Sequence, residues 1–158
     1  PTPAIDAGLS RIASECAAVG IVALLEMHPH LAGNARAALD TLSRVAHANL
    51  KINFDTGNVG FYNERGDPLA DLERLGSMIG GVHLKDGSGR FRHRWFPALG
   101  AGAIDFTRVF NLLATIGFDG ACAIEIEPPR DGSATQISVE SAVAKSVEHL
   151  RQIGRFAS

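Results

Sequence analysis

Four short apolar runs of the sequence each carry, near their carboxyl ends, a side chain that can ligate a metal. These side chains are Glu26 in IVALLEM, Asp55 in LKINFD, His83 in GVHLK and Glu125 in ACAIEI. Three carboxylates and one imidazole form a hard, mostly oxygen donor set, which suits Mn²⁺ or Mg²⁺ best. Co²⁺, Fe²⁺ or Zn²⁺ could occupy the same donors. The residue types therefore predict a divalent-metal site.

The alternation of side chains along a strand places these four groups on a common face. Residues two apart in a strand point the same way, so Asn53 accompanies Asp55 while Ile52 and Phe54 point to the other face. Polar groups that converge without partners are costly to bury, and a shared cation is the expected partner. Such a cation can hold sugar oxygens and stabilise an enediolate, while a metal-bound glutamate removes and returns a proton.

The elements that must position these groups alternate between strands and helices. The spacing between successive candidate ligands is close to the roughly 30 residues that a βαβ unit needs. The exception is the interval before Glu125, which contains a long loop at 86–104. The expected strands are 21–27, 50–55, 81–85 and 121–126. The expected helices are 3–19, three that begin after Asn34, Asp67 and Asp105, and one from about 138. One helix followed by four βα units predicts an α/β fold with a parallel sheet and outer helices.

Composition narrows the class of protein. The 158 residues are 46% hydrophobic and 20% charged, with a formal net charge of -2, which favours neither nucleic acid nor an anionic membrane as a partner. Cys16 and Cys122 are too few for a disulfide framework, so we expect a reducing, cytoplasmic setting. No apolar run is long enough for a membrane span, and no signal peptide is visible.

Five segments, in the order ALLEMHPH, INFDTGN, GVHLKD, LGAGAIDF and GFDGACAIEIE, make the chain resemble the xylose isomerase-like TIM-barrel superfamily of sugar phosphate isomerases and epimerases. The resemblance implies a partial (β/α)8 barrel: a single domain over 1–158 with about four parallel strands and outer helices. We expect it to be the C-terminal half-barrel, with the N-terminal half missing, because a complete barrel typically needs about 250 residues. The resemblance also implies the metal ligands, which are Glu26, Asp55, His83 and Glu125. In the epimerase branch two of them, Glu26 and Glu125, are the catalytic acid/base pair.

Five further residues are candidate substrate contacts, namely His28, Asn58, Lys85, Arg90 and Glu127. His28 and Lys85 share a face with the expected ligands, and Glu127 competes with Glu125 for the ligand position. Arg90 belongs to a basic, aromatic loop that could bind a phosphate or carboxylate of the substrate. For each of these residues, ordinary polarity at the rim of the barrel is the competing interpretation.

Three functions stay open at this stage. The first is a divalent-metal-dependent isomerase or epimerase of carbohydrate metabolism, active in its full-length form on a sugar or sugar phosphate. The second is another enzyme of the same scaffold, an inosose dehydratase or a hydroxypyruvate isomerase. The third is an inactive metal-binding half-barrel. Because a half-barrel leaves two sheet edges unpaired, a homodimer through these edges is a possible assembly.

Overall fold

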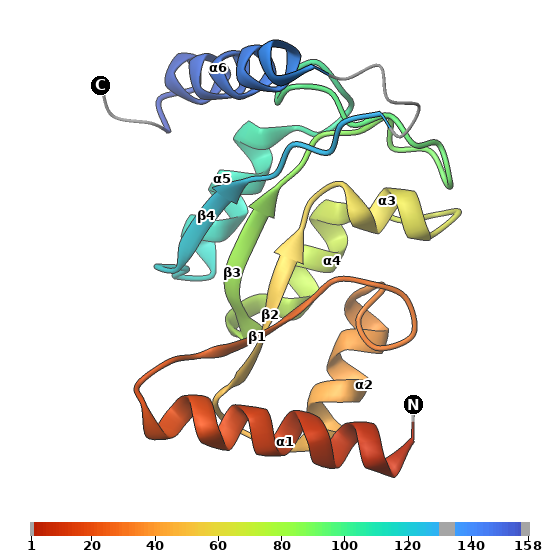
Figure 1. Ribbon diagram of the computed structural model, residues 1–158, viewed down its shortest axis with the longest axis vertical. Helices are drawn as coiled ribbons and strands as arrows, with labels where there is room; N and C mark the ends of the chain where they lie inside the picture. The colour runs from red at the N-terminus through yellow and green to blue at the C-terminus, as the bar shows by residue number, and fades with distance from the viewer. Residues whose placement is uncertain (1, 130–134, 156–158) are drawn as a thin grey trace.

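The centre of the fold is a four-stranded parallel sheet whose strands follow one another in sequence order, β1-β2-β3-β4 (Figure 1). The computed structural model describes residues 2–129 and 135–155. Its strands are β1 (Ala23–Glu26), β2 (Leu50–Asp55), β3 (Ile79–Leu84) and β4 (Ala121–Ile124). The α-helices and one short 3-10 helix are α1 (Pro3–Ala18), α2 (Ala35–Val45), α3 (Asn58–Tyr62), α4 (Pro68–Leu75), η1 (Gly76–Met78), α5 (Phe106–Thr115) and α6 (Gln136–Gln152). The predicted α/β half-barrel architecture is confirmed.

Three of the helices begin where capping side chains predict. Asn34 accepts a hydrogen bond from the Ala37 amide at the start of α2, and Asp105 does the same for Arg108 at the start of α5. Asp67 accepts from the first amides of α4, which has Pro68 at its first position. Each cap satisfies amides that have no partner within the helix. The short helix α3 was not expected from the sequence, because five residues are too few to show a helical period.

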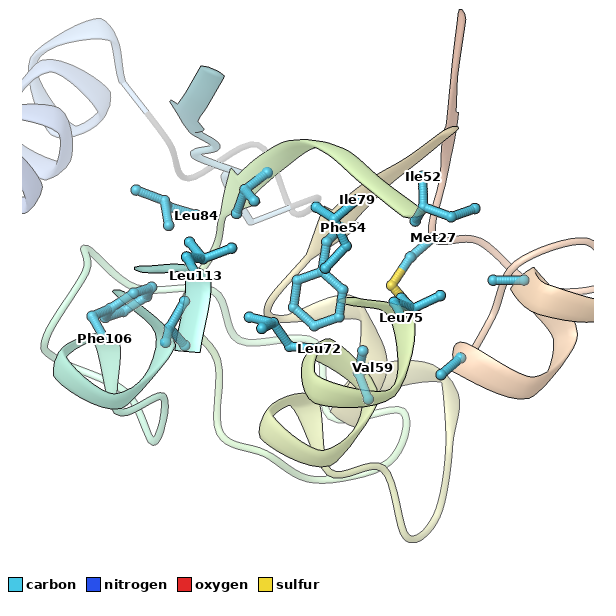
Figure 2. Close-up of a cluster of buried hydrophobic side chains, with 14 of the residues drawn as sticks. Met27, Ile52, Phe54, Val59, Leu72, Leu75, Ile79, Leu84, Phe106 and Leu113 are labelled. Atoms are coloured by element: carbon cyan, nitrogen blue, oxygen red, sulfur yellow. The ribbon is translucent and has the colours of Figure 1, made fainter. Parts of the chain in front are cut away.

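Two faces of the sheet differ in how they are covered. The face that carries Ile52 and Phe54 packs against α2, α4 and α5, and Figure 2 shows the resulting core around Leu72, Phe106 and Leu113. On the opposite face Leu24 remains 43% exposed, and Ala121 and Ala123 of β4 are also exposed. Within the described residues this second face has no covering layer, and β1 and β4 are the sheet's edge strands.

No helix in the described part of the chain combines the length and the apolar character that a membrane span requires. The apolar residues of the last helix, α6, are not all buried, since Leu150 is buried but Val143 is 41% exposed. Ser146 is buried instead, where its hydroxyl accepts a hydrogen bond from the Leu99 amide. The helix therefore contacts the loop after β3 through a polar group.

Asp86, directly after β3 and Lys85, organises the long loop that follows. Its carboxylate is fully buried and accepts hydrogen bonds from four backbone amides, those of Gly87, Gly100, Gly102 and Ile104, at 2.8–3.1 Å. A Cβ at Gly102 would collide with this carboxylate, so the close approach requires glycine there. One side chain thus ties both ends of the loop to the end of β3.

We expect Asp86→Ala to lower the free energy of unfolding by about 3 kcal/mol, because four buried amides lose their acceptor. The matched control is Asp105→Ala, which removes a single capping bond to Arg108 and should cost about 1 kcal/mol. Urea denaturation of both variants measures the difference. Equal losses would contradict the proposed importance of the Asp86 carboxylate.

Candidate metal centre

The four predicted ligands meet at the carboxyl ends of the four strands. Each offers one donor atom, and these four atoms lie within 4.8 Å of one another. Glu26 and Asp55 are the last residues of β1 and β2, His83 is next to last in β3, and Glu125 follows β4 directly. Parallel pairing produces this convergence, since Asp55 pairs with His83 and His83 with Ala123 across the sheet. The group is Glu26, Asp55, His83 and Glu125, as the sequence predicted.

Contacts within the group hold the donors in place. The His83 Nδ1 lies 3.2 Å from the Glu26 Oε1 and 2.9 Å from the Glu125 Oε2. The Asp55 Oδ1 accepts hydrogen bonds from the amides of Gly57 and Asn58, both at 2.9 Å. These amides belong to the turn that starts α3, so the local backbone after β2 fixes the orientation of Asp55.

A buried lysine lies among the same carboxylates. The Lys85 Nζ is 2.9 Å from the Glu125 Oε1, 3.2 Å from the Glu127 Oε2 and 3.6 Å from the Asp55 Oδ2. It also donates to the Asn58 Oδ1 at 3.3 Å. Its side chain is only 4% exposed, so the positive charge lies beneath the carboxylates and not on the open surface.

The electrostatic environment gives the two central carboxylates different proton affinities. Burial raises the pKa of Asp55 to about 7, even though the charge of Lys85 and the Asn58 amide oppose the change. Burial also disfavours the ionised form of Glu125, but the hydrogen bond and charge of Lys85 prevail and lower its pKa. For Lys85 burial is likewise outweighed, because Asp55 and Glu125 raise the pKa of its ammonium. Glu125 and Lys85 are therefore both charged at neutral pH.

The donor set fits a divalent cation. The Asp55 Oδ2 and the Glu125 Oε2 are buried and accept no hydrogen bond of good geometry, although the His83 Nδ1 lies 2.9 Å from the Glu125 Oε2. Buried polar atoms without a partner are uncommon and call for a ligand, an ion or water. Both oxygens belong to the convergent group, and a hard cation that takes carboxylate and imidazole donors would satisfy them.

The other predicted site residues lie at different distances from this group. His28 has its Nε2 3.6 Å from the Glu26 Oε1 and its Nδ1 3.1 Å from the Tyr62 hydroxyl, with a half-exposed side chain. Asn58 is buried, and its side-chain amide donates to the Met27 carbonyl. Glu127 pairs with Lys85 and with Arg94. Arg90 is exposed on the loop, where its amide donates to the Ser88 hydroxyl and its carbonyl accepts from the His93 amide.

Sequence reasoning placed Arg94 only within the basic loop and missed two other residues beside the site, Phe96 and Tyr62. Arg94 forms an ion pair with Glu127, and Phe96 places its ring 4.8 Å from the Lys85 Nζ. Tyr62 contacts His28 from α3. Arg94 and Phe96 come from the loop that Asp86 ties down, and an irregular loop has no period from which its contacts can be predicted. The HLKD segment was recognised in the sequence, but nothing in it indicated that Asp86 would bind the adjacent amide of Gly87 and three amides further along the loop.

The fold and the site define a parallel α/β half-barrel with a candidate metal centre at its strand ends. Residues 4–153 match the family described as xylose isomerase-like TIM barrel, and the chain belongs to this family. The confirmed family and fold agree with the resemblance found in the sequence.

The chain is similar to several sugar epimerases and related proteins. It is 28% identical over 134 residues to a ketose 3-epimerase of Arthrobacter globiformis, covering 78% of this chain and 43% of that protein. The xylose isomerase domain protein of Planctomyces limnophilus has a TM-score of 0.79 at 24% identity, with 96% of this chain and 54% of that chain covered. A D-psicose 3-epimerase of Clostridium cellulolyticum H10 has a TM-score of 0.74 at 19% identity, with 96% and 55% covered. The chain spans about half the length of these relatives.

The raised pKa of Asp55 predicts a specific pH dependence of stability in the presence of a chelator. A carboxyl whose pKa is higher in the folded state stabilises the fold below its ordinary pKa, and this stability is lost as pH rises through about 7. Asp55→Asn keeps an oxygen for the Gly57 and Asn58 amides but does not titrate. Relative to this variant, we expect the wild-type free energy of unfolding to fall by on the order of 3 kcal/mol between about pH 4 and pH 8.

Urea denaturation at a series of pH values measures this difference. A difference between wild type and Asp55→Asn that stays constant across the range would show that folding does not raise the pKa of Asp55.

Proposed function

We propose that this chain provides the metal centre of a divalent-metal-dependent sugar isomerase or epimerase. The observation that carries the proposal is the convergence of four donor atoms within 4.8 Å at the ends of four parallel strands. The family match and the similarity to a ketose 3-epimerase support a sugar as substrate. Mn²⁺ or Mg²⁺ is the proposed metal, because three of the four donors are carboxylate oxygens.

The proposed reaction moves a proton at a carbon next to the sugar carbonyl. The metal, held by Glu26, Asp55, His83 and Glu125, would bind sugar oxygens and stabilise the negative charge that develops when the proton leaves. Glu125 suits the role of base because its lowered pKa keeps it ionised at neutral pH. Glu26 is the proposed second acid/base group, since its Oε1 approaches the same His83 nitrogen as the Glu125 Oε2.

The surrounding residues have proposed roles that follow from their exposure. His28 borders Glu26 with a half-exposed ring that Tyr62 orients, so it is well placed to contact a sugar hydroxyl. Asn58 and Glu127 lie beside Lys85 and support the site from within. Arg90, on the exposed loop, is a proposed contact for a charged or outlying group of the substrate.

Metal binding is tested by titrating Mn²⁺ into chelator-treated protein in a calorimeter. We expect Glu26→Gln and His83→Ala each to weaken binding by roughly 100-fold or more, because each removes one donor. The control is Glu15→Gln, which makes the same charge change on the exposed surface of α1. Wild-type affinity in both site variants would exclude this metal centre.

Proton transfer is tested by incubating the Mn²⁺-loaded chain with a panel of ketoses in D₂O. We expect solvent deuterium to enter the sugar at the carbon next to the carbonyl, and we expect Glu125→Gln to abolish its uptake. Mass spectrometry and NMR of the recovered sugar detect the label. Loss of water from the substrate would indicate a dehydratase instead, and metal binding with no exchange in any sugar would contradict the proposed reaction for this chain.

The open edges of the sheet give a prediction about assembly. Edge strands with free backbone groups tend to pair with another chain, and β1 and β4 are the edge strands here. If they pair between two copies, sedimentation should show a dimer. Cys122 is an exposed residue of the edge strand β4. Cys122→Pro should then shift the protein toward monomer, because proline cannot donate a strand hydrogen bond. A monomeric wild-type chain would contradict pairing of the edges.

A further inference from the structure

Lys85 is the feature of the site that the proposed proton transfer does not use. Its ammonium lies among three carboxylates, of which Asp55 and Glu125 are proposed metal ligands and Glu127 is not. A charge removed from water is retained in a folded protein when close partners offset the cost of its desolvation. The three acceptors nearest the Nζ, on Glu125, Glu127 and Asn58, match the three N–H groups of an ammonium.

The position of the ammonium is fixed by packing as well as by charge. The Phe96 ring lies 4.8 Å from the Nζ. The stem of Lys85 runs so close to Gly57 that a Cβ there would approach the Lys85 Cγ at 3.0 Å. With its side chain 4% exposed, Lys85 is enclosed by these contacts beside the carboxylates.

We infer that Lys85 is a built-in counter-cation of the metal site, an inference that rests on the proposed function. Its ammonium holds Asp55, Glu125 and Glu127 together when the metal is absent. Its positive charge also opposes the metal, so that Lys85 weakens metal binding and keeps the ion exchangeable. Lys85 is thus a positioning residue that acts through the ligand carboxylates and not through contact with the sugar.

The direction of the effect on affinity follows from the other contacts of the ligands. Asp55 is oriented by the amides of Gly57 and Asn58, which do not depend on Lys85. Glu125 is also held by the His83 Nδ1 at 2.9 Å. Because both ligands keep a second source of orientation, removing the ammonium takes away charge repulsion toward a divalent cation while leaving the donor geometry in place.

Removing the same charge has the opposite effect on the metal-free protein. Asp55, Glu125 and Glu127 would then face one another without their shared cation, and like charges in a poorly solvated site repel strongly. The fold without metal should therefore lose stability. A larger share of its stability should then depend on added metal, because a ligand that binds only the folded state stabilises it by mass action.

The test compares Lys85→Met with Lys145→Met, which removes the same charge from an exposed position on α6. Calorimetric titration of Mn²⁺ should show a Kd at least about 10-fold lower for Lys85→Met than for wild type, and no change for Lys145→Met. Urea denaturation in a chelator should show a less stable fold for Lys85→Met alone. If Lys85→Met does not fold, the same measurements are made on Lys85→Gln, which keeps a polar side chain.

The outcomes separate this inference from the proposed function. A wild-type chain that binds Mn²⁺, together with a Lys85 variant that binds it equally or less tightly, overturns the role of Lys85 and leaves the metal centre intact. An unchanged Kd with a raised KM for the sugar would instead identify Lys85 as a substrate contact and overturn the inference. Absence of Mn²⁺ binding in wild type and variants alike would overturn the metal centre and, with it, the effect assigned to Lys85.

Discussion

Mutual repulsion of carboxylates is the constraint on which this site depends. Four strands end at one edge of the sheet, and the chain brings Glu26, Asp55, Glu125 and Glu127 together there. Negative groups held this close in a partly buried site must be balanced by cations or protons. The structure balances them in three ways: Lys85 lies beneath them, Arg94 pairs with Glu127, and burial raises the pKa of Asp55 to about 7.

Charge balance connects the strand ends to the loop that follows β3. Arg94 and Phe96, which contact Glu127 and Lys85, are both loop residues. The loop is held to the end of β3 by Asp86, immediately after Lys85 in the chain. Two adjacent residues therefore have different roles: Lys85 contacts the carboxylates of the site, and Asp86 binds the loop amides. The geometry of the site depends on this turn as much as on the strands.

The convergence of the candidate ligands could be predicted from the sequence because these residues follow regular structure. Glu26, Asp55, His83 and Glu125 lie on or directly after strands whose alternation and spacing can be read from the sequence, and the family resemblance implied the same four residues. Their assembly is found in the structure, although their binding of a metal stays a prediction. The preference for Glu125 over Glu127 as a member of the group agrees with the geometry, in which Glu127 contacts Lys85 and Arg94.

The contacts of Lys85 and of the loop could not be predicted from the sequence, because they depend on side-chain length and on irregular backbone. Alternation placed Lys85 on the same face as His83, but it does not show how far a long side chain reaches once the strand has ended. In the structure β3 ends at Leu84, and the Lys85 Nζ reaches acceptors on β2, on α3 and beyond β4. The loop sequence is basic and aromatic, but it has no periodic pattern from which the direction of its side chains could be predicted. Composition therefore indicated the arginines of the loop as a group and Arg90 was chosen as the candidate, whereas Arg94 is the loop arginine that pairs with Glu127.

The uncovered face of the sheet affects catalysis by the described half-barrel more than it affects the arrangement of the candidate ligands. All four predicted ligands lie within it, so the donors converge without any residue from another half. The covered face has a continuous core, whereas Val22 and Leu24 on the opposite side are each more than 40% exposed. Apolar side chains exposed in this way indicate a surface that is normally covered. Excluding water strengthens electrostatic interactions at a reacting carbon, so a layer over this face would contribute to turnover more than to metal binding.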